Sequence, residues 1–113
     1  KFSSHDVYLN VIGGMHIDEP ASDLGIALAL ISSITDRVIP DDLIAIGELG
    51  LAGECRGVDA PAMRIKEAVK IGFSKIVLPQ KNYLQLKKNG ELMKDVTYIP
   101  VKSIFDAMKI FVK

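Results

Sequence analysis

The second half of the sequence alternates between helix patterns and strand patterns, and this alternation limits the folds open to the chain. A helix is expected from Pro61 to about Ile71, because Asp59 is a good N-cap and Gly72 is a typical stop. The buried strand KIVLP follows and is closed by Pro79. Beyond it we expect a short Lys-rich helix over 80–89, the strand VTYIPV, and an amphipathic helix KSIFDAMKIFV with Ile104, Phe105, Met108 and Phe111 inward.

Strands and hairpins are expected to fill the first half, around one apolar helix. Residues 6–12, DVYLNVI, alternate like a strand with one buried face, and Gly13-Gly14 lets MHI return as its partner. The helix begins near Asp18 or Glu19, tolerates Pro20 in its first turn, and runs to about Thr35. It is expected to be mostly buried, through the apolar residues Leu24, Ile26, Ala27, Leu28, Leu30, Ile31 and Ile34.

The apolar run LIAIGEL is expected to be one short strand, and GLAGECRGV a second strand or hairpin. The sequence contains no repeat, low-complexity segment or linker. These patterns predict one α+β (mixed α/β) domain over residues 1–113. Because the chain starts at Lys1 without an initiator Met, we expect it to be a fragment of a longer protein.

Composition excludes several classes of protein. No apolar run of about eighteen residues is present and the N-terminus is not a signal peptide, so no membrane contact is expected. The lone Cys55 allows no internal disulfide, which fits a reducing cytoplasm. His5, His16 and Cys55 lack the spacing of metal ligands, so no metal site is expected.

The net charge of zero hides a strong asymmetry along the chain. Residues 1–60 carry three basic and ten acidic side chains, a net charge of −7, whereas residues 61–113 carry eleven and four, a net charge of +7. Either the fold interleaves the halves, or one acidic and one basic surface result. Separate surfaces would suit head-to-tail assembly or an anionic partner.

No nucleotide-binding motif is recognisable. The segment GELGLAGE has glycines but lacks the lysine of the phosphate-binding loop and the dinucleotide fingerprint. We therefore expect the chain itself to bind no cofactor.

The ordered segments EPASDLGIALALISS, IGELGLAGECRGV, RIKEA and GFSKIVLP resemble the proteolytic domain of the Lon family. The resemblance covers most of the chain and implies the fold of that domain, with an architecture like domain 2 of ribosomal protein S5. It also implies a Ser–Lys dyad, in which a hydroxyl attacks a peptide carbonyl and a lysine takes its proton.

Both dyad positions have lost their reactive groups. The nucleophile's position, directly after Pro20, is Ala21, and the lysine's position is Arg64. An arginine stays protonated and cannot act as a general base. The competing interpretation is a shifted dyad of Ser22 and Lys66, but these positions are rotated by about 100° and 200° on a helix from the positions they would replace. We expect no catalytic residue, and Ser22 is better explained as a residue of the helix's first turn.

Two segments point to one branch of the Lon-like proteins. They are EPASDL, with Glu19, Pro20, Ala21, Asp23 and Leu24, and its continuation SSITDRVIPDDLIAIGELGLAGECRGV. They resemble the C-terminal, Lon-like domain of the RadA (Sms) family of bacterial ATPases, which act in DNA damage repair and homologous recombination. The resemblance implies a pseudo-protease domain that serves as a scaffold, forms part of a hexameric ring, and contacts DNA during branch processing. It also implies that the full-length protein is a DNA-dependent ATPase. ATP, magnesium and zinc would then be bound by parts preceding Lys1.

Two alternatives stay open. The chain could be an active ATP-dependent Lon-type serine peptidase domain, or an inactive Lon-like domain of another ATPase, such as a magnesium-chelatase-like protein.

Basic residues supply the candidates for DNA contact, since phosphates need positive charge rather than fixed geometry. The candidates are Arg64, Lys66, Lys70, Lys81, Lys87, Lys88 and Lys94. For each one the alternative is a solvated surface side chain. Tyr83 alone is too little aromatic content to suggest base stacking.

Overall fold

The computed structural model describes residues 19–111, so the strand expected over 6–12, its hairpin, and His5 and His16 lie outside the described residues. Three parallel strands form the main sheet in the order β1-β4-β5, and two antiparallel strands form a hairpin. The strands are β1 (Leu43–Ala45), β2 (Glu48–Leu49), β3 (Cys55–Arg56), β4 (Lys75–Pro79) and β5 (Thr97–Val101). The helices are η2 (Pro20–Ser22), α2 (Asp23–Thr35), α3 (Pro61–Ile71), α4 (Gln80–Lys88), α5 (Ile104–Ala107) and η3 (Met108–Phe111).

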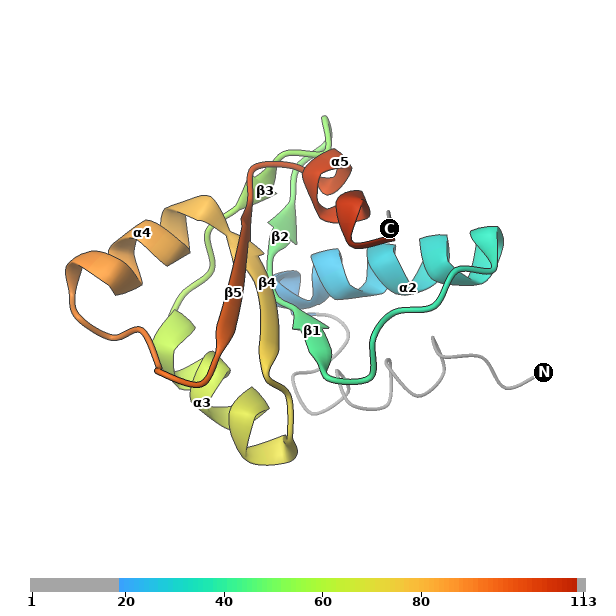
Figure 1. Ribbon diagram of the computed structural model, residues 1–113. Coiled ribbons are helices and arrows are strands. Elements are labelled where there is room, and N and C mark those ends of the chain that lie inside the picture. The colour runs from blue at the N-terminus through green and yellow to red at the C-terminus, as the bar shows by residue number, and fades with distance from the viewer. Residues whose placement is uncertain (1–18, 112–113) are drawn as a thin grey trace.

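The parallel sheet is covered from both sides. Figure 1 shows α3 and α4 on one side of the strands and α2 and α5 on the other. The central strand β4 is buried from Ile76 to Pro79, as expected for a parallel strand with helices on both faces. Leu28 of α2, Ile65 of α3 and Leu86 of α4 are almost fully buried against this sheet. The mixed α/β fold expected from the sequence is therefore confirmed.

Most expected elements occur at the expected places. The helix after Pro20 ends at Thr35, the helix over 61–71 has the expected bounds, and Gly72 ends it with a φ of 124°. The strand KIVLP, the helix after it and the strand in VTYIPV are also found. The local stop and start residues were sufficient for these boundaries.

The run LIAIGEL is not one strand, contrary to expectation. Ile46 donates to the carbonyl of Val77 at 2.8 Å and ends the pairing with β4. Gly47 then turns toward α2, where its N–H donates to the carbonyl of Ala21 at 2.9 Å and its own carbonyl accepts from Leu24 at 2.9 Å. A Cβ at Gly47 would lie 2.8 Å from the sulfur of Cys55. A glycine is therefore required where the chain crosses from the main sheet to the hairpin.

Further expectations were wrong in detail, among them the burial of Leu30, which is 51% exposed, and of Met108, which is 36% exposed. Ile34 of α2 is 81% exposed, because the buried face runs through Leu24, Leu28 and Ser32 and the helix extends past the sheet. Phe105 is 67% exposed, because α5 buries Ala107, and a side chain two residues earlier lies about 200° away around the helix. The N-cap of α3 is Ala60, in a left-handed conformation with a φ of 49°, and not Asp59.

Candidate functional site

The turn that begins α2 is tied to the β2–β3 hairpin. Ala21 lies in η2 with 3% of its surface exposed, and its side chain is a methyl group without a reactive atom. Asp23, the first residue of α2, accepts a hydrogen bond at 3.1 Å from the backbone N–H of Leu49. Asp23 of the EPASDL segment therefore holds the hairpin against the start of the helix.

Arg64 joins this turn to α3. Its Nη2 donates at 2.8 Å to Oε2 of Glu19 and at 2.8 Å to Oδ1 of Asp59, and its Nε donates at 2.8 Å to the carbonyl of Asp59. The side chain is only 11% exposed. The two positions that correspond to the Lon dyad therefore lie on elements that are joined directly, since Arg64 bonds to a residue two places before Ala21.

The contacts with Glu19 and Asp59 keep the guanidinium of Arg64 charged. The hydrogen bond to Glu19 raises the pKa of Arg64 above its already high ordinary value, and the hydrogen bond from Arg64 lowers the pKa of Asp59. Arg64 therefore stays a cation at any physiological pH and cannot accept a proton from a hydroxyl. It is also committed to two carboxylates, which leaves its guanidinium poorly placed to bind a DNA phosphate.

The residues of the shifted dyad have opposite environments. Ser22 has no exposed surface, and its backbone N–H donates to the carbonyl of Glu19 at 2.9 Å. Lys66 is exposed on α3. A peptide could reach Ser22 only after the turn rearranged, so the geometry offers no ready substrate path to this hydroxyl.

The six lysine candidates for DNA contact are all exposed. Lys66 and Lys70 lie on α3, Lys81, Lys87 and Lys88 lie on α4, and Lys94 lies in the loop before β5. None of them is in an ion pair within residues 19–111. Helices α3 and α4 contact each other on one side of the sheet (Figure 1) and carry a single acid, Glu67. The loop with Lys94 also carries Glu91 and Asp95. We use the name basic face for these six lysines together.

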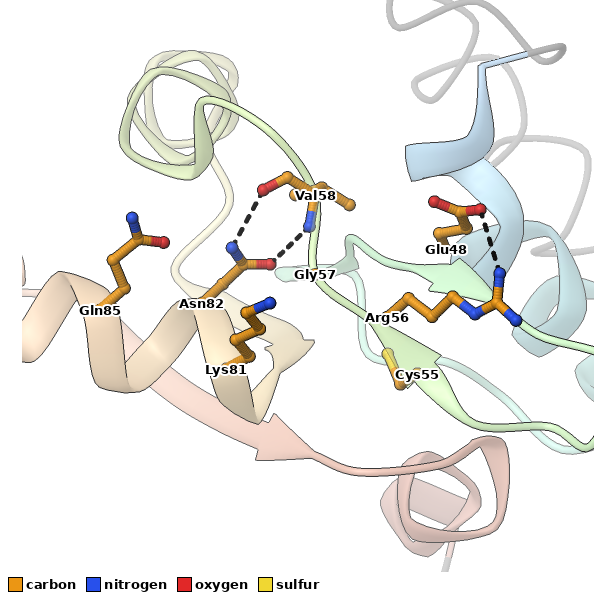
Figure 2. A pocket seen from close by; sticks show the side chains of 8 residues that line it. All are labelled: Glu48, Cys55, Arg56, Gly57, Val58, Lys81, Asn82 and Gln85. Atoms are coloured by element: carbon orange, nitrogen blue, oxygen red, sulfur yellow. Dashed lines mark hydrogen bonds and ion pairs between the residues drawn. The ribbon is translucent and has the colours of Figure 1, made fainter.

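A cleft of about 640 Å³ opens between β3 and α4. Figure 2 shows its lining, which consists of Glu48, Cys55, Arg56, Gly57, Val58, Lys81, Asn82 and Gln85. Asn82 is 3% exposed, accepts from the N–H of Val58 at 2.8 Å, and donates to its carbonyl at 3.0 Å. This amide therefore fastens the segment between β3 and α3 to α4. Sequence reasoning missed Asn82, because a single polar residue in a Lys-rich helix gives no signal of a partner 24 positions earlier.

The thiol in this cleft is a poor nucleophile. Burial raises the pKa of Cys55 to about 11, so the thiol is protonated at neutral pH. Within the described part of the chain, no group of three or more His, Cys, Asp or Glu could hold a metal ion. No helix of residues 19–111 is long and apolar enough to cross a membrane.

Comparisons with known proteins show the family to which the chain belongs. A family model described as subunit ChlI of Mg-chelatase matches residues 1–82. The DNA repair protein RadA of Salmonella typhimurium is 40% identical over 111 residues, which is 98% of this chain and 23% of that protein. The DNA repair protein RadA of Synechocystis is 40% identical over 108 residues, 96% of this chain and 20% of that protein. The same name belongs to a Brucella abortus protein that is 43% identical over 95 residues, 84% of this chain.

The chain spans about a fifth to a quarter of the length of these relatives. The resemblance to RadA that the EPASDL segment indicated is confirmed by relatives that match almost all of the chain. The chain belongs to the family described as subunit ChlI of Mg-chelatase, and it is a homologue of the C-terminal part of the RadA DNA repair proteins.

Proposed function

We propose that this chain is a non-proteolytic, Lon-like scaffold domain of a RadA-type DNA repair and recombination protein, and that its basic face contacts DNA. The observation that supports the non-proteolytic role is the bonding of Arg64 to Glu19 and Asp59, together with the methyl group of Ala21 at the nucleophile's position. The hydroxyl of this turn, on Ser22, is fully buried, and Arg64 cannot act as its general base, so the geometry supports no peptide hydrolysis. The matched relatives, named as DNA repair proteins, support the cellular context.

A peptidase assay with a casein substrate tests the first half. The protein and its Ser22→Ala variant should both show only the background rate of cleavage. If the unchanged protein cleaves casein and Ser22→Ala abolishes this cleavage, the chain is a Lon-type serine peptidase and the proposal is overturned. Ser32→Ala, another buried serine of the same helical segment, is the control for effects of losing a buried hydroxyl.

The DNA half of the proposal rests on the basic face. Six exposed lysines without ion-pair partners in residues 19–111 leave positive charge free on neighbouring elements. Positive side chains bind DNA by neutralising phosphates and releasing counterions, so the affinity falls steeply with salt. The pair Lys87 and Lys88, at the end of α4, offers two such contacts in one place.

Salt-dependent DNA binding tests this half. We expect Lys87→Ala with Lys88→Ala to reduce the slope of log affinity against log salt by up to about 1.8, since each phosphate contact contributes about 0.9. Lys109→Ala is the matched control, because Lys109 is an exposed lysine outside the basic face that pairs with Asp106. Equal slopes for the unchanged protein and the double variant would remove α4 from the DNA contact.

Self-association in a hexameric ring is the further part of this proposal. The negative first half and positive second half of the sequence support a head-to-tail contact between copies. Sizing at low and high salt tests it, and a monomer under both conditions would count against assembly by this domain. ATP and magnesium binding, zinc binding, and ATP-driven branch processing belong in this proposal to other parts of such a protein. The lone thiol and the repair relatives support a cytoplasmic location.

A second candidate function is that of an inactive Lon-like domain in another ATPase. It is favoured by the matching family model, which is described as a subunit of magnesium chelatase. An inactive Lon-like domain of another ATPase would share the scaffold described above. The two candidate functions differ in DNA binding. A protein that binds neither single-stranded nor duplex DNA would favour the domain of another ATPase.

A further inference from the structure

Strand β3 is paired along one edge and only partly paired along the other. On its first edge β3 pairs with β2. On its outer edge Glu54 faces Ser103 in an antiparallel bridge, with the Ile104 N–H donating to Gly53 and the Cys55 N–H donating to Lys102, both at 2.8 Å. This pattern is the beginning of an antiparallel ladder.

The ladder stops after one step for a visible reason. The next bond would run from the N–H of Lys102 to the carbonyl of Cys55, but that N–H donates instead to Oδ2 of Asp106 at 2.9 Å. The carbonyl of Cys55 and both backbone groups of Gly57 are left without a hydrogen-bond partner among residues 19–111. Strand edges with unpaired groups accept an added strand.

The unpaired edge opens onto the cleft beside α4. Cys55 and Gly57 both line this cleft, whose volume of about 640 Å³ lies within the range of ligand sites. A Cβ at Gly57 would lie 3.5 Å from Cδ of Lys81, so the α4 wall approaches the backbone closely. Ala21 and Arg64, at the positions of the Lon dyad, are not among the residues that line this cleft.

The charged side chains that line the cleft indicate which kind of ligand it would bind. Figure 2 shows the side chain of Arg56 directed away from α4 toward Glu48, with which it forms an ion pair at 3.9 Å. Lys81 has no ion-pair partner within residues 19–111, so it supplies the uncompensated charge of the cleft. No aromatic side chain lines the cleft to stack a base.

We propose that the outer edge of β3 binds an extended acidic peptide segment of a partner protein, which pairs with the backbone of Gly57, beyond the place that Lys102 occupies, and sets a carboxylate beside Lys81. Backbone pairing supplies affinity, and Lys81 selects the sign of the charge. The inference shares Lys81 with the basic face, but its backbone contacts at the β3 edge play no part in the proposed DNA binding.

Amide NMR of the 15N-labelled protein tests the inference with synthetic peptides. The probe is an acetylated heptapeptide of alternating valine and threonine with a central aspartate, and its partner probe has lysine in place of the aspartate. We expect the acidic peptide to shift the amide of Gly57 and to bind at least about threefold more tightly than the basic one, the scale of one exposed ion pair. No shift at Gly57 at millimolar peptide, or equal affinity of the two peptides, would overturn the inference.

Variants separate the cleft from the rest of α4. Lys81→Glu should lower the affinity for the acidic peptide about tenfold, because repulsion replaces attraction. Lys81→Gln should give a smaller loss and remains interpretable if the charge reversal disturbs folding. Lys88→Glu, on the same helix but outside the cleft, should bind the peptide like the unchanged protein. A single-stranded oligonucleotide that shifts the Gly57 amide when the acidic peptide does not would refute the proposed occupant.

Discussion

The ion pair between Glu19 and Arg64 allows the sharpest test of how this site is built. We expect Arg64→Met, which keeps most of the apolar stem, to lower the free energy of unfolding by about 2 kcal/mol, within the range for a hydrogen bond to a charged group. The Arg64 side chain is 11% exposed and its bond to Glu19 is 2.8 Å long. Asp59, by contrast, is 89% exposed, so solvent screens most of its attraction to Arg64.

A double-mutant cycle with Glu19→Gln isolates the pair itself. We expect a coupling energy of about 1–2 kcal/mol between the two positions, because both side chains are at least partly withdrawn from water. Urea unfolding followed by circular dichroism measures each variant, and the slope with urea should stay constant. Coupling below about 0.3 kcal/mol would refute the reasoning that this pair joins the α2 turn to α3.

The exposed Arg56 supplies a matched control. Its side chain is 55% exposed and pairs with Glu54 at 3.1 Å on the hairpin. Arg56→Met should change the unfolding free energy much less than Arg64→Met, since surface ion pairs contribute little. Equal losses for the two arginines would show that burial of the guanidinium does not determine its contribution.

The same site carries a pH dependence with a defined sign. The hydrogen bond from Arg64 lowers the pKa of Asp59 below its ordinary value of 3.8. Stability from this contact is therefore fully present above pH 3.8 and is lost as the pH falls through the lower pKa of the folded state. Arg64→Met should flatten the acid limb of the stability profile, measured by thermal unfolding between pH 2 and 5. An unchanged acid limb would contradict this linkage.

Three further predictions concern the cleft and the core. Cys55 should react with iodoacetamide at pH 8 about 100-fold more slowly than in the urea-unfolded protein, because its pKa of about 11 suppresses the thiolate; equal rates would contradict the burial of the thiol. Asn82→Ala should lower the free energy of unfolding by about 1–3 kcal/mol, because both backbone groups of Val58 lose their hydrogen-bond partner. A variant as stable as the unchanged protein would mean that water replaces the amide. Leu28→Ala should cost about 2–5 kcal/mol, whereas Ile34→Ala, at an 81% exposed site, should stay within about 0.5 kcal/mol; similar losses would refute the assigned buried face of α2.

Local signals were enough to predict most of the element boundaries. Pro20, Gly72 and Pro79 act through their own backbone restrictions, so their effect is readable without knowledge of the fold. The turn at Gly47 could not be predicted from local sequence signals. Its cause is a close approach to Cys55 and Leu24, which are near only after folding.

Positions set by distant partners were harder to predict. The resemblance to the Lon family led to Ala21 and Arg64, but Glu19 as the partner of Arg64 lies 45 positions earlier and gives no local pattern. Asp59 was expected to cap α3 through its side chain. Arg64 binds that carboxylate instead, and Ala60 is the N-cap of α3. Competition between two partners for one carboxylate is decided by geometry that a single sequence does not display.

The Arg64 contact also explains how the scaffold can persist without a reactive pair. In a Ser–Lys dyad, a neutral lysine must lie beside a hydroxyl, which places a polar pair between the α2 turn and α3. Here Arg64 joins the same two elements through a charge pair with Glu19 that has no proton to exchange at neutral pH. If this contact fixes the geometry, Arg64→Lys should keep the charge but lose part of the fork geometry that reaches both carboxylates, and stability should fall between the values for arginine and methionine. A lysine variant as stable as the unchanged protein would show that charge alone holds the turn to α3.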